Sequence, residues 1–378
     1  MSILLGTRTL DVPILQGGMG VGVSMGGLAG AVAACGAMGT ISTAIPGYDE
    51  PDFGKNPNAA NLRVLAREIE KAKQISKEKG LVAINAMVAT VQYAESVMTA
   101  IKSGVDAIVS GAGLPNELPA IAKGADVLLA PIVSGGRAAR VICRMWETRH
   151  QRYPDFVVLE GPQAGGHLGF SKEEVKSGSA PKLEDLIKET IEALRPFEER
   201  AKRAIPVFAA GGVWDGKDAA RMARQGAAGV QLATRFIGTY ECDASQGFKD
   251  ILIAAKKEDV QIVQSPVGMP GRALRTPLID RLSNGVKTAA EHCVNCLTPC
   301  PKKETPYCIM EALVKALKGN YEEGLFFCGS NVWRLDRMMH VSELIDEIMS
   351  LPYYMPDKVR STPGWERTCT KHFPLFAR

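Results

Sequence analysis

The feature that most constrains this fold is a regular alternation of short apolar runs with longer stretches of helical character. The apolar runs show little period-two alternation, which predicts strands buried on both faces, at 12–19, 38–43, 81–88, 106–112, 127–134, 156–163, 206–212 and 229–236. The intervening stretches predict helices at 25–35, 61–79, 91–102, 117–123, 137–149, 183–203 and 217–225. Eight βα units within roughly 230 residues match the size of a (β/α)8 barrel, so we expect an α/β TIM barrel.

The pattern changes after residue 236. A helix and a Gly/Pro-rich loop are expected over 240–290, followed by helices at 309–318 and 341–349. We therefore predict a barrel over 1–240 and a C-terminal, mainly helical extension over 241–378 that packs on it. A doubly wound sheet is the alternative, but it usually has fewer strands. The glycines between 17 and 27 also lack the Gly-x-Gly-x-x-Gly spacing of a dinucleotide-binding turn.

Composition excludes several classes of protein. The 378 residues are 46% hydrophobic and 23% charged, as in ordinary globular proteins. The 45 basic and 41 acidic residues give a net charge of +4 without a basic block, so we expect no nucleic-acid partner. No apolar run approaches the roughly 18 residues of a membrane span. Arg8 and Asp11 interrupt the apolar N-terminal stretch, so we expect no signal peptide and a cytoplasmic protein. The sequence leaves the oligomeric state open.

Three glycine clusters fall at the carboxyl ends of predicted strands, where barrel enzymes carry their active sites. They are "QGGMG" (16–20), "QAGGHLG" (163–169) and "AAGGV" (209–213). Each alone fits a tight turn, but three at one rim favour backbone that closely approaches a ligand. Loops after the last two strands often bind phosphate, so we expect a phosphate-bearing ligand. Asp215 is expected to be a helix N-cap.

The segments "PILQGGMG", "EGPQAGGHLG", "PVFAAGGVWDG" and "GVQLATRFIG" resemble the nitronate monooxygenase family, formerly called 2-nitropropane dioxygenases. The flavin-dependent enoyl-ACP reductases share its architecture. The resemblance covers roughly residues 10–240, and "SPVGMPGRA" is also similar. It implies an FMN-binding barrel with His167 as the catalytic residue. It places the cofactor contacts on Gly17, Gly18, Met19, Asn85, Glu160, Gly165, Gly212, Gln231, Leu232, Ala233 and Thr234. The family commonly has Gln at the position of Glu160, so an acid here departs from its pattern.

The implied chemistry suits a histidine beside a flavin. Histidine titrates near neutrality and can move a proton or stabilise developing charge, while the flavin transfers electrons. We expect a nitronate monooxygenase that oxidises alkyl nitronates with oxygen. The alternative is an NAD(P)H-dependent reductase of enoyl thioesters. A non-catalytic phosphate-ligand sensor and a flavin-free phosphosugar isomerase are less favoured interpretations.

Four cysteines crowd into the segment 293–308, with the spacing C-x2-C-x3-C-x7-C. Such thiolates are candidate ligands of an iron–sulfur cluster or of zinc. The predicted ligands are Cys293, Cys296, Cys300 and Cys308. The alternative is a set of free or packed thiols, since a large chain without a secretory signal seldom uses disulfides.

Overall fold

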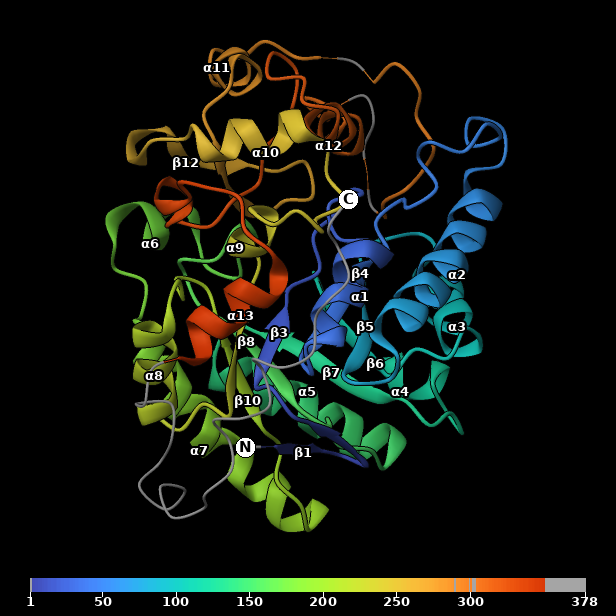
Figure 1. The fold of residues 1–378 in the computed structure, drawn as a ribbon, viewed down its shortest axis with the longest axis vertical. Coiled ribbons are helices and arrows are strands. Elements are labelled where there is room, and N and C mark those ends of the chain that lie inside the picture. The colour runs from blue at the N-terminus through green and yellow to red at the C-terminus, as the bar shows by residue number, and fades with distance from the viewer. Residues whose placement is uncertain (1, 289, 299, 301–303, 351–378) are drawn as a thin grey trace.

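A computed structural model describes residues 2–288, 290–298, 300 and 304–350. Eight parallel strands form a closed barrel at its centre (Figure 1). They are β3 (Ile14–Gln16), β4 (Met38–Ser42), β5 (Leu81–Met87), β6 (Ala107–Gly111), β7 (Leu128–Val133), β8 (Val157–Glu160), β10 (Val207–Ala210) and β11 (Gly229–Leu232). Gln16 of β3 pairs with Leu232 of β11 and closes the ring. The predicted TIM barrel is confirmed.

Helices surround the barrel strands, as the alternation predicted. They are α1 (Gly26–Ala34), α2 (Pro57–Ser76), α3 (Tyr93–Lys102), α4 (Leu118–Ile121), α5 (Gly136–His150), α7 (Leu183–Ala201) and α8 (Gly216–Arg224). Asp215 caps α8, where its Oδ1 accepts the backbone N–H groups of Lys217 and Asp218 at 3.0 and 3.1 Å. This confirms the predicted N-cap. Each helix buries an apolar side against the strands, which explains why the strands lack polar alternation.

The N-terminus of α1 is capped from a distant part of the chain. The Asp243 carboxylate accepts the N–H groups of Met25, Gly27 and Leu28 at 2.8 to 3.2 Å. The first turn of α1 contains no acidic residue of its own. A carboxylate at this end satisfies unpaired donors and complements the helix dipole. Asp243 therefore attaches the segment after the barrel to the first barrel helix.

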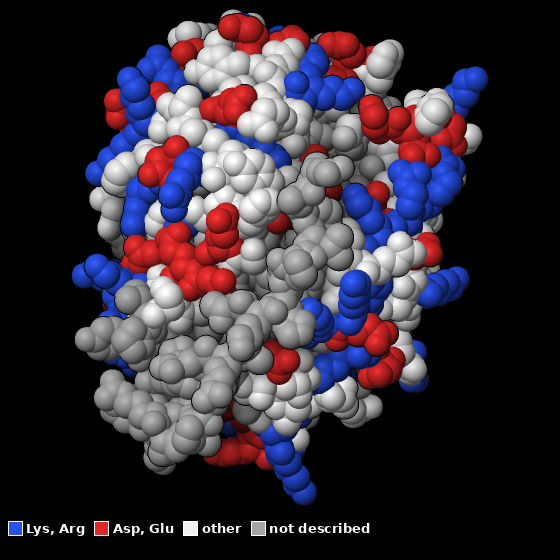
Figure 2. Space-filling view, in the orientation of Figure 1, with Lys and Arg blue, Asp and Glu red and all other residues white. Residues whose placement is uncertain are grey.

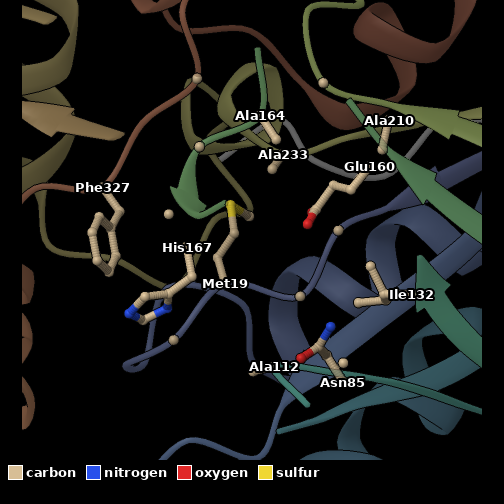
Figure 3. Close-up of a pocket in the computed structure, with 18 of the residues that line it drawn as sticks. Met19, Asn85, Ala112, Ile132, Glu160, Ala164, His167, Ala210, Ala233 and Phe327 are labelled. Atoms are coloured by element: carbon tan, nitrogen blue, oxygen red, sulfur yellow. The ribbon is translucent and has the colours of Figure 1, made fainter. Parts of the chain in front are cut away.

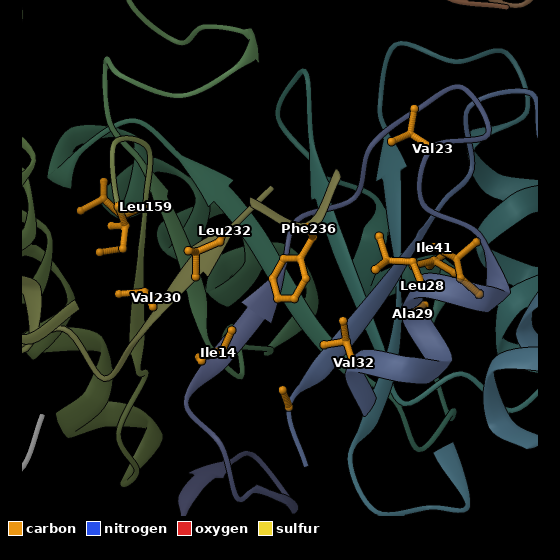
Figure 4. Packing of buried hydrophobic residues seen from close by; sticks show 14 of the residues in the cluster. Ile14, Val23, Leu28, Ala29, Val32, Ile41, Leu159, Val230, Leu232 and Phe236 are labelled. Atoms are coloured by element: carbon orange, nitrogen blue, oxygen red, sulfur yellow. The ribbon is translucent and has the colours of Figure 1, made fainter. Parts of the chain in front are cut away.

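Buried apolar side chains form separate layers inside and outside the strands. The inner layer includes Leu15, Phe156 and Phe208, and the last two rings meet edge to face with centroids 5.6 Å apart. A hairpin of β1 (Ile3–Leu5) and β2 (Arg8–Leu10) adds fully buried leucines to this layer, and it lies at the amino-terminal end of the barrel (Figure 1). The outer layer joins strands to helices, as Ile14 and Phe236 do in Figure 4.

The extension covers the opposite, carboxyl end of the barrel (Figure 1). The short helix α9 (Thr234–Ile237) follows the last barrel strand and precedes the extension. The described elements of the extension are α10 (Gln246–Ile253), β12 (Val260–Gln264), β13 (Pro270–Leu274), α11 (Pro277–Ser283), α12 (Ile309–Leu317) and α13 (Val341–Met349). The predicted helices at 309–318 and 341–349 are confirmed. The expectation of a strand through 236 was wrong, because β11 ends at Leu232 and Thr234 begins a short helix. The division of the chain at residue 240 stays a prediction, and residues 351–378 lie outside the described part.

One element of the barrel pairs with the extension. Strand β9 (Gly166–His167), in the loop after β8, joins β12 and β13 in a three-stranded sheet. His167 is in register with Gly271, and Gly166 with Arg272. The short helix α6 (Lys172–Ser177) follows β9. The histidine of the glycine-rich loop therefore lies on a strand that the later hairpin holds in place.

Charged side chains of both signs are interspersed over the face seen in Figure 2. This distribution agrees with the small net charge of the chain. None of the described helices has the length and apolar character needed to cross a membrane.

Candidate functional site

A cavity of about 470 Å³ lies at the carboxyl ends of the barrel strands and beneath the extension. All twelve residues expected at the catalytic or cofactor site line its wall. They are Gly17, Gly18, Met19, Asn85, Glu160, Gly165, His167, Gly212, Gln231, Leu232, Ala233 and Thr234. The structure therefore brings these residues together from five barrel strands or the loops after them. Their individual roles stay predictions.

His167 is held on two sides by residues of the extension. Its Nε2 lies 2.7 Å from the Ser265 hydroxyl, which stands between β12 and β13. Its ring meets Phe327 edge to face, with centroids 5.2 Å apart. Burial penalises the imidazolium and lowers the pKa of His167 to about 4. The side chain is therefore a neutral imidazole at pH 7. In the tautomer whose Nε2–H donates to the Ser265 hydroxyl, the other nitrogen, Nδ1, can accept a proton.

Glu160, the last residue of β8, points into the cavity from another side (Figure 3). The Asn85 carboxamide projects from the end of β5 into the same space, and Met19 lies between it and His167. Burial raises the pKa of Glu160 to about 7. Among the described residues, no hydrogen bond or ion pair to its carboxyl group is found. The cavity thus contains an acid and a base whose environments shift their pKa values in opposite directions.

The glycine-rich ends of β3 and β10 leave room that side chains would fill. A Cβ on Gly18 would lie 2.3 Å from the Asn85 Cβ, and one on Gly212 would lie 2.2 Å from the Gln163 Oε1. Gly212 also has a φ of +88°, in the region that favours glycine. Glycine at these positions lets the main chain form the cavity wall itself.

The segment 328–331 of the extension closes one end of the cavity against the last two strands. The Gly329 N–H donates to the Thr234 hydroxyl at 2.9 Å, and the Asn331 side chain donates to the Gly212 carbonyl at 3.0 Å. The Ser330 hydroxyl between them is buried and has no hydrogen-bond partner within the described chain. A buried unpaired hydroxyl is costly, and a ligand oxygen here would satisfy it after rotation about χ1. This end of the cavity therefore suits a polar group of a ligand.

The opposite part of the wall is apolar. The extension and its cysteine-rich segment supply Leu297, Ile309, Met310, Leu313, Leu325 and Phe327. The turn between β12 and β13 adds Val267 and Met269. Such a wall suits the hydrocarbon part of a ligand, because burying apolar surface there is favourable.

The predicted metal site at Cys293, Cys296, Cys300 and Cys308 is not supported. In the described part of the chain, no group of three or more His, Cys, Asp or Glu side chains is arranged to hold a metal ion. Three of these thiols instead pack against the apolar cluster around α12. Burial raises the pKa of Cys296 to about 12, so its thiol disfavours the thiolate form that binds metals. This segment contributes Leu297 to the cavity wall.

Several site residues were not predicted from the sequence. Ser265 and Phe327 contact His167, and Ser330 and Asn331 lie at the end of the cavity closed by segment 328–331. Ser265 belongs to the segment "SPVGMPGRA", whose similarity to the family was the only signal available. The other three lie in "FFCGSN", which has no local pattern that points to a site.

Comparison with known proteins agrees with this architecture. The chain belongs to the nitronate monooxygenase family, whose model matches residues 2–350. A protein of Staphylococcus aureus named "Probable nitronate monooxygenase" is 26% identical over 301 residues, 73% of this chain and 78% of that protein. The names of the family and of the similar proteins are those of oxidoreductases.

Two further similarities extend the comparison. The (3aS,4S,5R,7aS)-5-hydroxy-7a-methyl-1-oxo-octahydro-1H-indene-4-carboxyl-CoA dehydrogenase of Mycobacterium tuberculosis is 27% identical over 276 residues. The match covers 73% of this chain and 66% of the dehydrogenase, just under two thirds of its length. The solved structure of FabK from Thermotoga maritima superposes with a TM-score of 0.69 at 24% identity, over 91% of this chain and 94% of FabK. This likeness establishes the shared fold.

Proposed function

We propose that this protein is an FMN-dependent oxidoreductase that oxidises alkyl nitronates with oxygen. The observation that carries the proposal is the neutral, half-buried His167 in a glycine-walled cavity that has an unpaired Ser330 hydroxyl at one end. FMN combines a flat apolar ring system with a phosphate, and both features match the wall. Family membership supports a flavin in this cavity.

The residues present fit such a cofactor. Gly17, Gly18 and Met19 would lie along the ring, facing Asn85 and Glu160. Main-chain N–H groups near Gly212 and Thr234, with the Ser330 hydroxyl, would bind the phosphate. Bound FMN would supply the electron transfer. The protein would supply position, exclusion of water and a proton acceptor.

His167 has a defined part in this chemistry. A neutral imidazole can accept the Cα proton of a nitroalkane, or donate a hydrogen bond to the anionic nitro oxygens of a nitronate. Ser265 selects which ring nitrogen faces the substrate, because the other nitrogen is engaged with its hydroxyl. The Phe327 edge restricts rotation of the ring. His167 is thus oriented before substrate enters.

The test begins with protein purified without oxygen. We expect the two-banded absorbance of oxidised flavin and release of FMN on denaturation. Addition of an alkyl nitronate without oxygen should bleach the flavin, and admission of oxygen should restore it. His167→Ala should retain FMN and lose most turnover. A protein that does not bind added FMN would overturn the proposal, and full turnover in His167→Ala would overturn the role of the histidine.

A second candidate is the reduction of enoyl thioesters by NAD(P)H. The observation that favours it is the apolar wall from the extension, which could accommodate an acyl chain. The similarity to a dehydrogenase named for a carboxyl-CoA compound also directs attention to thioesters. NADPH added to the same anaerobic protein distinguishes the two functions. Rapid bleaching by NADPH and reoxidation by an enoyl thioester would favour the reductase, whereas bleaching by the nitronate alone would favour the monooxygenase.

A further inference from the structure

The carboxyl group of Glu160 is not used by the chemistry assigned to His167. Its backbone is paired within the barrel, opposite Ala210 of β10. Its side chain projects into the cavity among Met19, Asn85 and Ile132 (Figure 3). No donor or cation within the described residues contacts the carboxyl oxygens. Glu160 is half-buried, and a carboxyl group without partners in such a place is costly when ionised, so a ligand in the cavity would be a suitable partner for it.

No neighbouring charge offsets the effect of burial on the Glu160 carboxyl group. The neighbouring strands β7 and β10 present Ile132, Val133 and Ala210 to the cavity, and none of these side chains ionises. Three other titratable residues line the cavity: His167, Cys328 and Arg235.

None of these three supplies a free positive charge. His167 is neutral, and burial raises the pKa of Cys328 to about 12. The Arg235 guanidinium is paired with Glu347 at 2.8 Å. The pKa of Glu160, raised to about 7, has burial as its cause. Neutral pH therefore lies within the titration of this acid.

We propose that Glu160 enters the site as a neutral carboxylic acid and donates a hydrogen bond to the bound flavin, so that FMN binds the protonated form of the protein more tightly. This inference rests on the proposed FMN function and adds to it a proton donor distinct from His167. The cavity then holds one group that gives a hydrogen and one that accepts a proton. Environments that separate two titratable groups in this way assign their acid and base roles.

The inference has a measurable consequence through proton linkage. If FMN prefers protonated Glu160, its dissociation constant rises as the pH passes above about 7, by at most about tenfold per pH unit for a single group. Glutamine has nearly the same shape and donates from its amide without titrating. Glu160→Gln should therefore bind FMN with an affinity that lacks this component of the pH dependence.

The experiment is a titration of flavin-depleted protein with FMN, followed by flavin fluorescence between about pH 5.5 and 9. Wild type, Glu160→Gln and His167→Gln are compared. The FMN phosphate titrates equally with all three proteins, so differences between their pH profiles come from the substituted residue. We expect the affinity for FMN of wild type and of His167→Gln to fall at alkaline pH. At pH 9, Glu160→Gln should bind FMN at least tenfold more tightly than either of these proteins. Identical pH profiles in wild type and Glu160→Gln would overturn the inference and leave FMN binding established. Failure of wild type to bind FMN would instead overturn the proposed function and the inference with it.

Infrared spectroscopy of the wild-type protein gives an independent measurement if Glu160→Gln does not fold. A protonated carboxylic acid has a C=O stretch separate from that of a carboxylate. We expect this band near pH 6, its loss above about pH 8, and a shift of the band when FMN is added. A carboxylate spectrum across the whole range would overturn the inference.

Discussion

Replacement of His167 by glutamine should change how the stability of the protein depends on pH. The imidazole has a pKa of about 4 in the folded chain and 6.5 when unperturbed. Below pH 6.5 the unfolded chain therefore binds a proton that the folded chain does not. Its contribution to stability is fully present above that pH and is lost as the pH falls toward 4. Each pH unit of difference corresponds to about 1.4 kcal/mol, so at pH 5 wild type should have lost about 2 kcal/mol through this group.

Glutamine does not titrate, so His167→Gln should not show this loss. Urea unfolding at pH 7.5 and pH 5 gives the free energy of unfolding of both proteins at each pH. Subtracting the variant from wild type cancels the other groups, including Glu160. We expect the free energy of unfolding of wild type, relative to that of His167→Gln, to be about 2 kcal/mol lower at pH 5 than at pH 7.5. His167→Ala should give the same shift, although its absolute stability differs. A difference independent of pH in both variants would refute the argument that burial holds this histidine neutral.

Three further changes test separate contacts. Ser265→Ala removes the hydroxyl 2.7 Å from His167, so turnover should fall roughly 10- to 100-fold while the flavin content stays unchanged. Steady-state kinetics measure the turnover and flavin absorbance measures the content. Unaltered turnover would contradict the orienting role of Ser265. Gly18→Ala places a Cβ 2.3 Å from the Asn85 Cβ and should weaken FMN binding by about 1–3 kcal/mol, as measured by fluorescence titration. Gly17→Ala is the control, because its Cβ would have its nearest neighbour at 3.3 Å, and it should weaken binding less. Asp243→Asn weakens the cap of α1 and should lower the free energy of unfolding by about 0.5–2 kcal/mol, and an unchanged denaturation midpoint would argue against that contribution.

The barrel could be predicted because its strands are buried on both faces. Continuous apolar runs such as 81–88 and 127–134 leave few alternatives, and the structure places β5 and β7 within them. The ends of the runs were harder to place, since "QGGMG" and "ATRF" continue the apolar pattern after the hydrogen-bonded strand has ended. The hairpin of β12 and β13 was predicted as a loop, because its turn is rich in proline and glycine.

The candidate site was predictable where it depends on barrel geometry. All parallel strands end at one rim, so glycine clusters far apart in sequence had to meet there. The partners of His167 could not be predicted in this way. Ser265 lies 98 residues further along the chain, and its approach depends on how the extension folds back. The cysteine prediction failed for the opposite reason, because close spacing in sequence does not determine which side chains face one another.

The pairing of β9 with β13 also bears on the order in which the enzyme matures. A growing chain completes all eight barrel strands at Leu232, before the hairpin that borders His167 has been synthesised. At that stage the histidine has neither its strand partner nor the hydroxyl that orients it. The surroundings of His167 are therefore completed late in synthesis, after all eight barrel strands. A ribosome stalled just after Leu232 would carry every barrel strand but not the hairpin that borders His167.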